Sequence, residues 1–263
     1  MALSNFPEIY ERWLVGPMFQ PWAEIVVDRS HLAAGERVLD VACGTGVVAR
    51  LVMKHLSGSG HVVGVDLSPQ MLALARAIES RVDWRAGNAS AMPLHDGERF
   101  DVVLCHQGLQ FFPDKPAAAR EMRRAMGRGG RLVVGVWKSL DDTPFVRDLH
   151  QVAERRLGTF VDRRHSCGDP VALEQLFIEA GFEDVRVESL TRTIRFAEPA
   201  VFVRLNSSAV VGMSTGSSTM ADDGRARLRD LIAEDSAEVI RQYTDDDGLA
   251  FELGAYIVTA HGR

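Results

Sequence analysis

Between residues 37 and 137, short runs of β-branched residues alternate with segments whose apolar residues recur at helical spacing. The expected strands are residues 38–41, 61–65, 82–85, 100–105 and 131–136, and the expected helices between them are residues 47–55, 71–78 and 116–126. Strands that alternate with crossover helices form a mostly parallel sheet with helices on both faces. The alternation therefore predicts an α/β fold of the Rossmann-like, doubly wound type, in which ligands bind beyond the carboxyl ends of the strands.

The pattern continues more weakly after Trp137. Helices are expected from Thr143-Pro144 to Gly158 and from Asp169-Pro170 to Gly181, strands over 185–190 and 191–196, an amphipathic helix over 225–243 and a short last strand over 256–260. Residues 206–224, rich in Ser, Thr, Gly and Met, predict a loop or part of a lid. We expect a single domain over 1–263, made of N-terminal cap helices (1–34), a cofactor-binding core (35–196), an inserted cap (197–254) and a final strand (255–263).

Composition limits the partners of the chain. Its 36 acidic residues outnumber its 30 basic ones, and the resulting net charge of −6 disfavours a nucleic-acid substrate. Three cysteines without paired spacing argue against a disulfide framework and a metal site. The chain has neither the basic start and apolar run of a signal peptide nor an apolar stretch long enough to span a membrane. These features predict a cytoplasmic protein that acts on a small molecule.

A strand, a glycine-rich turn and a helix follow one another around residues 38–55. The turn loosely fits the dinucleotide fingerprint, with Gly44 and Gly46 as its first glycines. Asp40, four residues before Gly44, would be poorly placed beside a pyrophosphate and suits a cationic ligand or the amino group of an amino acid. Asp66, at the end of the second strand, can accept hydrogen bonds from both hydroxyls of a ribose. Asp66 alone does not separate a nicotinamide cofactor from a methyl donor.

The string Asp-x-Ala-Cys-Gly-Thr-Gly at residues 40–46 is similar to motif I of class I S-adenosylmethionine-dependent methyltransferases. Residues 86–94 resemble the loop after the third strand in the ubiquinone- and menaquinone-biosynthesis type. In that type an acid often contacts the adenine amino group, whereas this chain has Asn88, whose amide oxygen can accept the same bond. Two further departures are Gln110-Phe111 in place of a frequent histidine pair, and Arg128 in place of proline in a Pro-Gly-Gly turn.

This resemblance implies a seven-stranded sheet with an antiparallel last strand, helical N-terminal and inserted cap elements, and S-adenosylmethionine as cofactor, with S-adenosylhomocysteine as product. The cofactor contacts it implies are Tyr10, Asp40, Ala42, Cys43, Gly44, Gly46, Asp66, Leu67, Met71, Gly87, Asn88, Ala89 and Cys105. The acceptor contacts we expect are Phe19, Trp22, Gln107, Gln110 and Phe111.

Methyl transfer is an in-line displacement at a sulfonium methyl, so the protein mainly has to hold the acceptor close, aligned and dry. His106, after the fourth strand, is the candidate general base because histidine titrates near neutral pH. The residues leave oxygen, nitrogen and carbon acceptors open, and they do not decide the oligomeric state, for which a homodimer is one option.

Two other functions compete with methyl transfer. An NAD(P)-dependent oxidoreductase would explain the glycines and Asp66, but it leaves Asp40 and the Asn88 loop unexplained. A non-catalytic relative would retain the cofactor site without turnover. Sequence cannot show turnover, so this alternative stays open.

Overall fold

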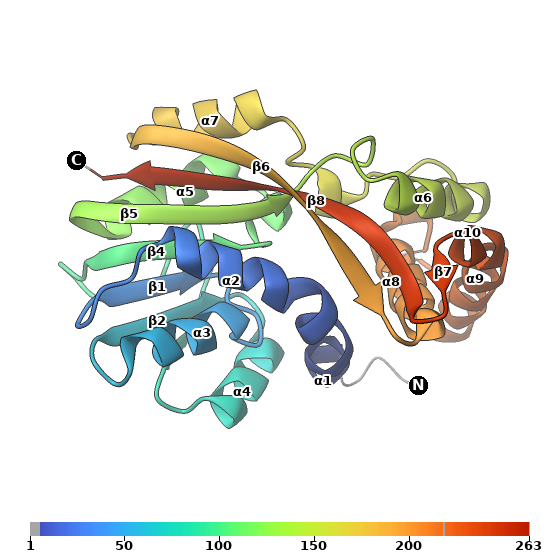
Figure 1. Ribbon diagram of the computed structural model, residues 1–263, viewed down its shortest axis with the longest axis horizontal. Coiled ribbons are helices and arrows are strands. Elements are labelled where there is room, and N and C mark those ends of the chain that lie inside the picture. The colour runs from blue at the N-terminus through green and yellow to red at the C-terminus, as the bar shows by residue number, and fades with distance from the viewer. Residues whose placement is uncertain (1–5, 218, 263) are drawn as a thin grey trace. The chain divides into compact units, whose positions relative to one another are not determined.

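The computed structural model describes residues 6–217 and 219–262, which form an α/β architecture around one sheet (Figure 1). The strand order is β3-β2-β1-β4-β5-β8-β6, and the two-residue β7 pairs with β8. The strands are β1 (Arg37–Val41), β2 (His61–Asp66), β3 (Asp83–Ala86), β4 (Phe100–His106), β5 (Met126–Trp137), β6 (Glu183–Phe196), β7 (Thr244–Asp245) and β8 (Gly248–His261). Strands β1 to β5 pair in parallel, whereas the arrow of β8 points opposite to that of β5. The predicted mostly parallel sheet with an antiparallel last strand is confirmed, with β7 as an additional short strand.

The chain divides into two compact units. The first contains the residues up to Val136, Asp169–Leu190 and the residues from Ala255 onward; the second contains Trp137–Gly168 and Thr191–Gly254. The second unit thus takes in residues 137–168 as well as the whole segment 197–254 that was expected to be an inserted cap. The division into core and cap drawn from the sequence stays a prediction.

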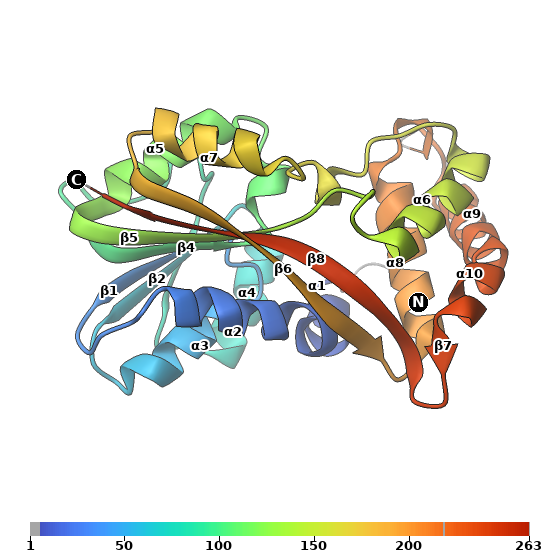
Figure 2. The same ribbon diagram turned by 45° about the horizontal axis from the view of Figure 1, so that its top comes forward.

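In the first unit, helices cover both faces of the sheet (Figure 2). Helices α2 (Gln20–Arg29) and α3 (Val47–Leu56) lie on one face, and α5 (Lys115–Ala125) and α7 (Pro170–Glu179) lie on the other. Strand β1 is buried from both sides: Val38, Leu39 and Val41 are 0% exposed. Because both faces of β1 are covered, its residues show no alternation of buried and exposed positions, and even Asp40 is buried.

The remaining helices of this unit lie near the ends of the strands. Helix α4 (Pro69–Ile78) begins at Ser68, whose Oγ accepts a hydrogen bond from the Met71 N–H, with Pro69 in the first turn. The N-terminal region runs through α1 (Phe6–Tyr10) and a π-helix, η2 (Glu11–Phe19), into α2. A short 3-10 turn, η3 (Leu109–Phe111), follows β4.

The second unit is mainly helical, with α6 (Pro144–Leu157), α8 (Pro199–Met213), α9 (Asp222–Asp235), α10 (Ala237–Gln242) and the 3-10 turns η4 (Arg163–His165) and η5 (Thr215–Ser217). An aromatic cluster forms part of its core, with ring centroids 4.3 to 6.4 Å apart. The cluster consists of Phe145, Phe196, Phe202, Tyr243 and Phe251.

Several sequence predictions for this region were wrong. The expected loop over 206–224 is largely helical, because α8 continues to Met213 while its Val210 and Val211 pack against Ala153 and Ile232. The expected helix over 225–243 is broken at Ser236, whose Oγ donates to the Ile232 carbonyl. The two strands expected over 185–196 are one strand of 14 residues, and the last strand is also 14 residues long. Tertiary packing, which local pattern does not report, sets these boundaries.

We predict that Phe145→Ala destabilises the second unit strongly. Phe145 is 1% exposed, and its ring lies 4.3 Å from that of Phe251, so the truncation leaves a cavity worth about 3–5 kcal/mol. Val161→Ala, in the same unit but at a side chain 72% exposed, should change the unfolding free energy by less than about 0.5 kcal/mol. Denaturant unfolding of both variants checks this, and equal losses would contradict the role given to the cluster.

Candidate active site

The loops that follow β1 and β4 meet at the carboxyl edge of the sheet. Ala42 and Gln107, the residues just beyond these neighbouring parallel strands, both have left-handed backbones, with φ of 57° and 56°. A Cβ on Gly108 would lie 2.5 Å from the Cβ of Ala42, so the two loops approach as closely as a glycine permits. Left-handed residues other than glycine cost energy and gather at functional sites. Their pairing here marks this edge as the candidate site.

The glycines of the first loop have different tasks. Gly44 has a φ of 56° with nothing within 4 Å of where a Cβ would stand, so a ligand can approach its backbone closely. Gly46, at a φ of 88°, begins α3, and its Cβ would lie 2.4 Å from the indole of Trp84. A Cβ on Gly64 of β2 would also lie 2.4 Å from this indole. The close approach to Trp84 requires a glycine at position 46, and the predicted ligand contact of Gly46 stays a prediction.

Asp66 joins the first loop to the start of α4. One carboxylate oxygen accepts the Gly44 N–H at 2.8 Å, and the other accepts the Ser68 N–H at 2.8 Å. The side chain is only half-buried, so it can still accept bonds from a ligand. Leu67, beside it, is 74% exposed, and Met71 in the first turn of α4 is half-buried. This arrangement offers a polar acceptor next to an open apolar surface.

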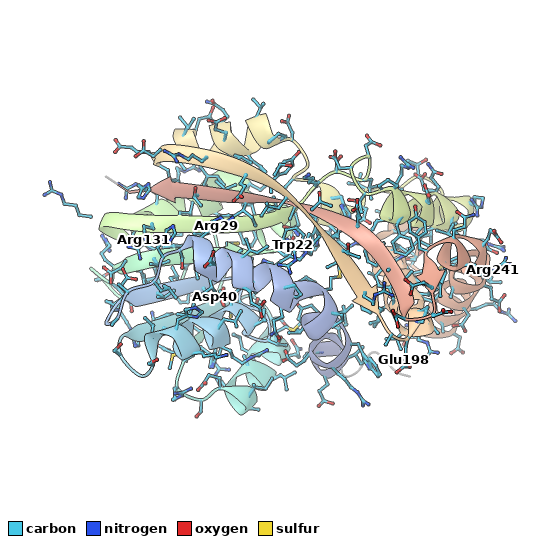
Figure 3. The ribbon with its side chains drawn as sticks, viewed as in Figure 1. Trp22, Arg29, Asp40, Arg131, Glu198 and Arg241 are labelled. Atoms are coloured by element: carbon cyan, nitrogen blue, oxygen red, sulfur yellow. The ribbon has the colours of Figure 1, made fainter. Side chains whose placement is uncertain are left out.

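Asp40 lies between the sheet and α3, is 1% exposed, and accepts the N–H of Ala49 at 3.1 Å (Figure 3). Ala49 is in the first turn of α3, so the carboxyl caps the helix and holds the glycine loop in place. Burial, with the nearby Asp66 carboxylate, raises the pKa of Asp40 to about 8. The side chain bonds to the protein itself, so its effect on a bound ligand would be electrostatic.

The N-terminal region is tied to the same loop. Arg50 on α3 donates to the Glu11 carboxylate at 2.7 Å and to the Thr45 carbonyl at 2.6 Å. Tyr10, the residue before Glu11, packs its ring 4.9 Å from that of Phe19. Desolvation, with Glu11, Asp66 and Asp40 nearby, raises the pKa of Tyr10 far above its ordinary value, so the phenol stays neutral. Its predicted place near the cofactor loop agrees with these neighbours.

The loop after β3 is fixed mainly by its own contacts. Gly87 donates its N–H to the Asp66 carbonyl at 2.9 Å, and a Cβ on it would lie 2.4 Å from Pro93. The Asn88 side-chain oxygen accepts the Ser90 N–H at 2.9 Å, and Ala89 is buried. The Asn88 oxygen retains a second lone pair, so a further bond to a ligand amino group remains chemically available.

The two cysteines at the strand ends, Cys43 and Cys105, are buried. Cys43 is 6% exposed, and burial raises the pKa of its thiol well above the ordinary value. Cys105 is 0% exposed, so the structure places it behind the loop surface rather than on it. Both fill space where the loops cross closely.

His106 is buried at the end of β4, and its Nε2 donates to the carbonyl of Phe19 at 3.1 Å. Burial lowers the pKa of His106 to about 4, so the ring is neutral and weakly basic near pH 7. This environment argues against the predicted role of general base. Its evident role is to hold the end of η2 against β4.

The predicted acceptor residues differ in access. Gln110 donates from Nε2 to the Gln107 Oε1 at 2.9 Å, and both side chains are buried. The Nε2 of Gln107 has no hydrogen-bond partner among the residues that the structure describes. Phe111 is 45% exposed, whereas Trp22 on α2 is 0% exposed (Figure 3). Trp22 is therefore a core residue, and its predicted ligand contact is not supported by this placement.

Sequence reasoning missed Trp84, Arg50 and Glu11. Gly64 stands opposite Trp84 in the β2–β3 register, so a glycine paired with a tryptophan was the available signal for the packing beneath the loop. No local pattern links Arg50 to Glu11, which are 39 residues apart in the chain.

A family model for a methyltransferase domain matches residues 39–134, the segment that contains the first loop, Asp66, Asn88 and the end of β4. A demethylmenaquinone methyltransferase of Lactiplantibacillus plantarum is 36% identical over 136 residues, 49% of this chain and 56% of that protein. A 2-phytyl-1,4-naphtoquinone methyltransferase of Synechococcus elongatus is 30% identical over 168 residues, 62% of this chain and 70% of that protein. The chain belongs to the class I S-adenosylmethionine-dependent methyltransferases.

Solved structures agree with this methyltransferase in fold. A phosphoethanolamine N-methyltransferase of Haemonchus contortus superimposes with a TM-score of 0.59 at 19% identity, over 98% of this chain and 56% of that one. The [4+2]-cyclase SpnF superimposes with a TM-score of 0.53 at 21% identity, over 92% of this chain and 81% of that one. At such identities the likeness concerns the fold alone.

The residues of the site suit the methyl donor of this family. The open backbone at Gly44 leaves room for a ligand, and Asp66 presents a half-exposed carboxylate beside it. The Thr45 hydroxyl is buried without a hydrogen-bond partner among the described residues. Carboxylates near the loop complement a ligand that carries ammonium and sulfonium groups.

We predict that Gly46→Ala destabilises the methyltransferase more than Gly58→Ala. Both glycines have left-handed backbones, with φ of 88° and 86°, so alanine costs about 1–2 kcal/mol at either. Only at Gly46 does the new Cβ also meet the Trp84 indole, and overpacking adds about 1–3 kcal/mol. Thermal unfolding followed by tryptophan fluorescence compares the two, and equal shifts would remove Trp84 from the account of this loop.

Proposed function

We propose that the protein transfers the methyl group of S-adenosylmethionine to a small, largely apolar aromatic acceptor that carries hydroxyl groups on its ring, such as a reduced quinone. The observation that carries the cofactor half is Asp66, whose carboxylate links the open Gly44 backbone to the start of α4 within the segment matched by the family model. The fold puts this carboxylate at a strand end, where doubly wound sheets bind the ribose of a nucleotide.

The proposed methyl acceptor is inferred from the polarity of the residues near the loop after β4 and from the names of two related proteins. Phe111 is exposed near the loop after β4, and the nearby amides of Gln107 and Gln110 are neutral. Within the part of the chain that the structure describes, the N–H of Gln107 Nε2 has no hydrogen-bond partner, and such a donor suits an oxygen of the methyl acceptor. Two relatives are named as methyltransferases of demethylmenaquinone and of a naphthoquinone, both aromatic rings with oxygens. These points together favour a ring carbon or a hydroxyl oxygen on the ring, rather than an amine nitrogen, as the atom that is methylated.

The chemistry needs orientation more than it needs a reactive side chain. The bound donor supplies a methyl group already activated by the positive sulfur. Asp66 and the Gly44 loop would orient the donor, Tyr10 and η2 would exclude water from it, and Gln107 would hold the acceptor oxygen. Correct alignment can contribute about 7–11 kcal/mol to the lowering of the barrier. None of these tasks requires a covalent intermediate.

Three further points belong to the same proposal. The acceptor is a free small molecule rather than a nucleic acid, in keeping with the acidic net charge of −6. Across the described residues, no helix combines the length and apolarity that crossing a bilayer requires. The cytoplasm is the compartment we infer from the sequence, and the oligomeric state stays open.

We expect calorimetric titration to give micromolar binding of S-adenosylmethionine and S-adenosylhomocysteine and no binding of NAD. Asp66→Asn should weaken both adenosyl ligands at least about tenfold, since it removes a charge-assisted acceptor. Asp28→Asn, at an exposed carboxylate, is the matched control and should leave binding unchanged. Binding of NAD alone would overturn the proposed function. Turnover with reduced naphthoquinones then tests the acceptor class.

We expect His106→Asn to lower kcat by less than about tenfold. A ring of pKa about 4 is a poor base near neutral pH, and general base catalysis is usually worth 10²–10⁴-fold, about 3–5 kcal/mol. Between about pH 6 and 7, the pH profiles of kcat for the wild-type protein and the variant should have the same form, because His106 does not change its protonation there. A hundredfold loss, together with an inflection of the wild-type profile that the variant lacks, would reinstate His106 as the base.

A further inference from the structure

Asp40 is a buried carboxyl that the protein leaves electrically uncompensated. It is 1% exposed, and within residues 6–217 and 219–262 its side chain accepts one hydrogen bond, from the Ala49 N–H, and forms no ion pair. One neutral donor at the start of a helix offsets only part of the cost of burying a carboxylate. The helix cap needs an acceptor oxygen but not a charge, so the acid does more here than capping alone requires.

The charged groups nearest Asp40 act on its ionisation in opposite directions. Asp66 at the end of β2 opposes its ionisation, and Arg50 on α3 favours it. Arg50 is already paired with the Glu11 carboxylate of η2 at 2.7 Å. The other titratable neighbours are Tyr10 on α1 and Cys43 in the loop, both neutral. Burial, with the Asp66 carboxylate, outweighs the Ala49 N–H and Arg50 and raises the pKa of Asp40 to about 8, so the carboxyl is mostly protonated at pH 7 before any ligand arrives.

The donor and the product of the proposed reaction differ in one charge. S-adenosylmethionine carries a sulfonium, whereas S-adenosylhomocysteine has a neutral thioether at the same atom. A carboxyl that is poised near neutral pH and lies beneath the cofactor loop responds to that difference, because a nearby cation favours its charged form.

Resting on the proposed function, we propose that Asp40 is a specificity-determining residue that exchanges a proton with solvent during each cofactor cycle. It ionises when the sulfonium donor binds and takes a proton again once the thioether product is formed. The site then binds the donor more tightly than the product as the pH rises, and the product leaves a site whose carboxyl is neutral.

The balance of the step is simple. In the transfer, the sulfur keeps the electron pair of the broken C–S bond, and an electron pair of the acceptor forms the new bond to the methyl carbon. The proton that the acceptor loses goes to solvent. The proton that returns to Asp40 also comes from solvent, so no oxidant, reductant or further reactant is needed.

The test is calorimetric titration of the full chain with each adenosyl ligand at pH 7, in two buffers of different ionisation enthalpy. The wild-type protein should release up to one proton more on binding the donor than on binding the product. Its preference for the donor should rise by up to about tenfold per pH unit between about pH 6 and 8. Asp40→Asn keeps the oxygen that accepts the Ala49 N–H, and it should abolish both the proton difference and the pH dependence.

The controls separate the possible failures. Asp28→Asn removes an exposed carboxylate and should behave as wild type, and the melting temperature of each variant reports folding. Equal proton release for the two ligands in the wild-type protein would overturn this inference alone, even if Asp40→Asn does not fold. A proton difference that survives in Asp40→Asn would assign it to another group and also overturn it. If neither ligand binds the wild-type protein, the proposed function fails first and this inference falls with it.

Discussion

The parallel pairing of β1 with β2 on one side and β4 on the other is the constraint on which the site depends. Because the strands run in the same direction, the loops after all three end at one edge of the sheet. Residues far apart in the chain meet there, as when the Asp66 carboxylate accepts the Gly44 N–H at 2.8 Å. A slip of one residue would turn each fully buried valine of β1 to the opposite, equally covered face, where other side chains pack.

Close packing beneath the edge decides which backbone is free to meet a ligand. Trp84 fills the space under Gly46 and Gly64, and this keeps the glycine loop from collapsing onto the sheet. Gly44 stands clear of that packing with open space around it. The same sequence motif thus combines a rigid support at Gly46 with an accessible backbone at Gly44. A motif match alone does not make this distinction.

The mostly parallel sheet and the cluster of loops at its carboxyl edge could be predicted from the sequence, because short runs of β-branched residues and the glycine-rich turn are local signals. It did not predict that α8 would continue to Met213, since Ser- and Gly-rich residues there are held helical by packing against Ala153 and Ile232. The family resemblance also placed Trp22 among the acceptor contacts, and the titration range of histidine made His106, after the fourth strand, the candidate base. Burial, which follows from the tertiary fold, makes the first a core residue and the second a neutral ring.

Electrostatics gives the site its character. Around the first loop both acids accept backbone N–H groups, Asp66 from Gly44 and the buried Asp40 from Ala49, and Arg50 pairs with Glu11. A neutral ligand gains little from such an environment, whereas a ligand that brings a positive charge stabilises two carboxylates at once. The charge of the sulfonium therefore acts twice, as the chemical activation of the methyl group and as the feature by which the protein would recognise the donor.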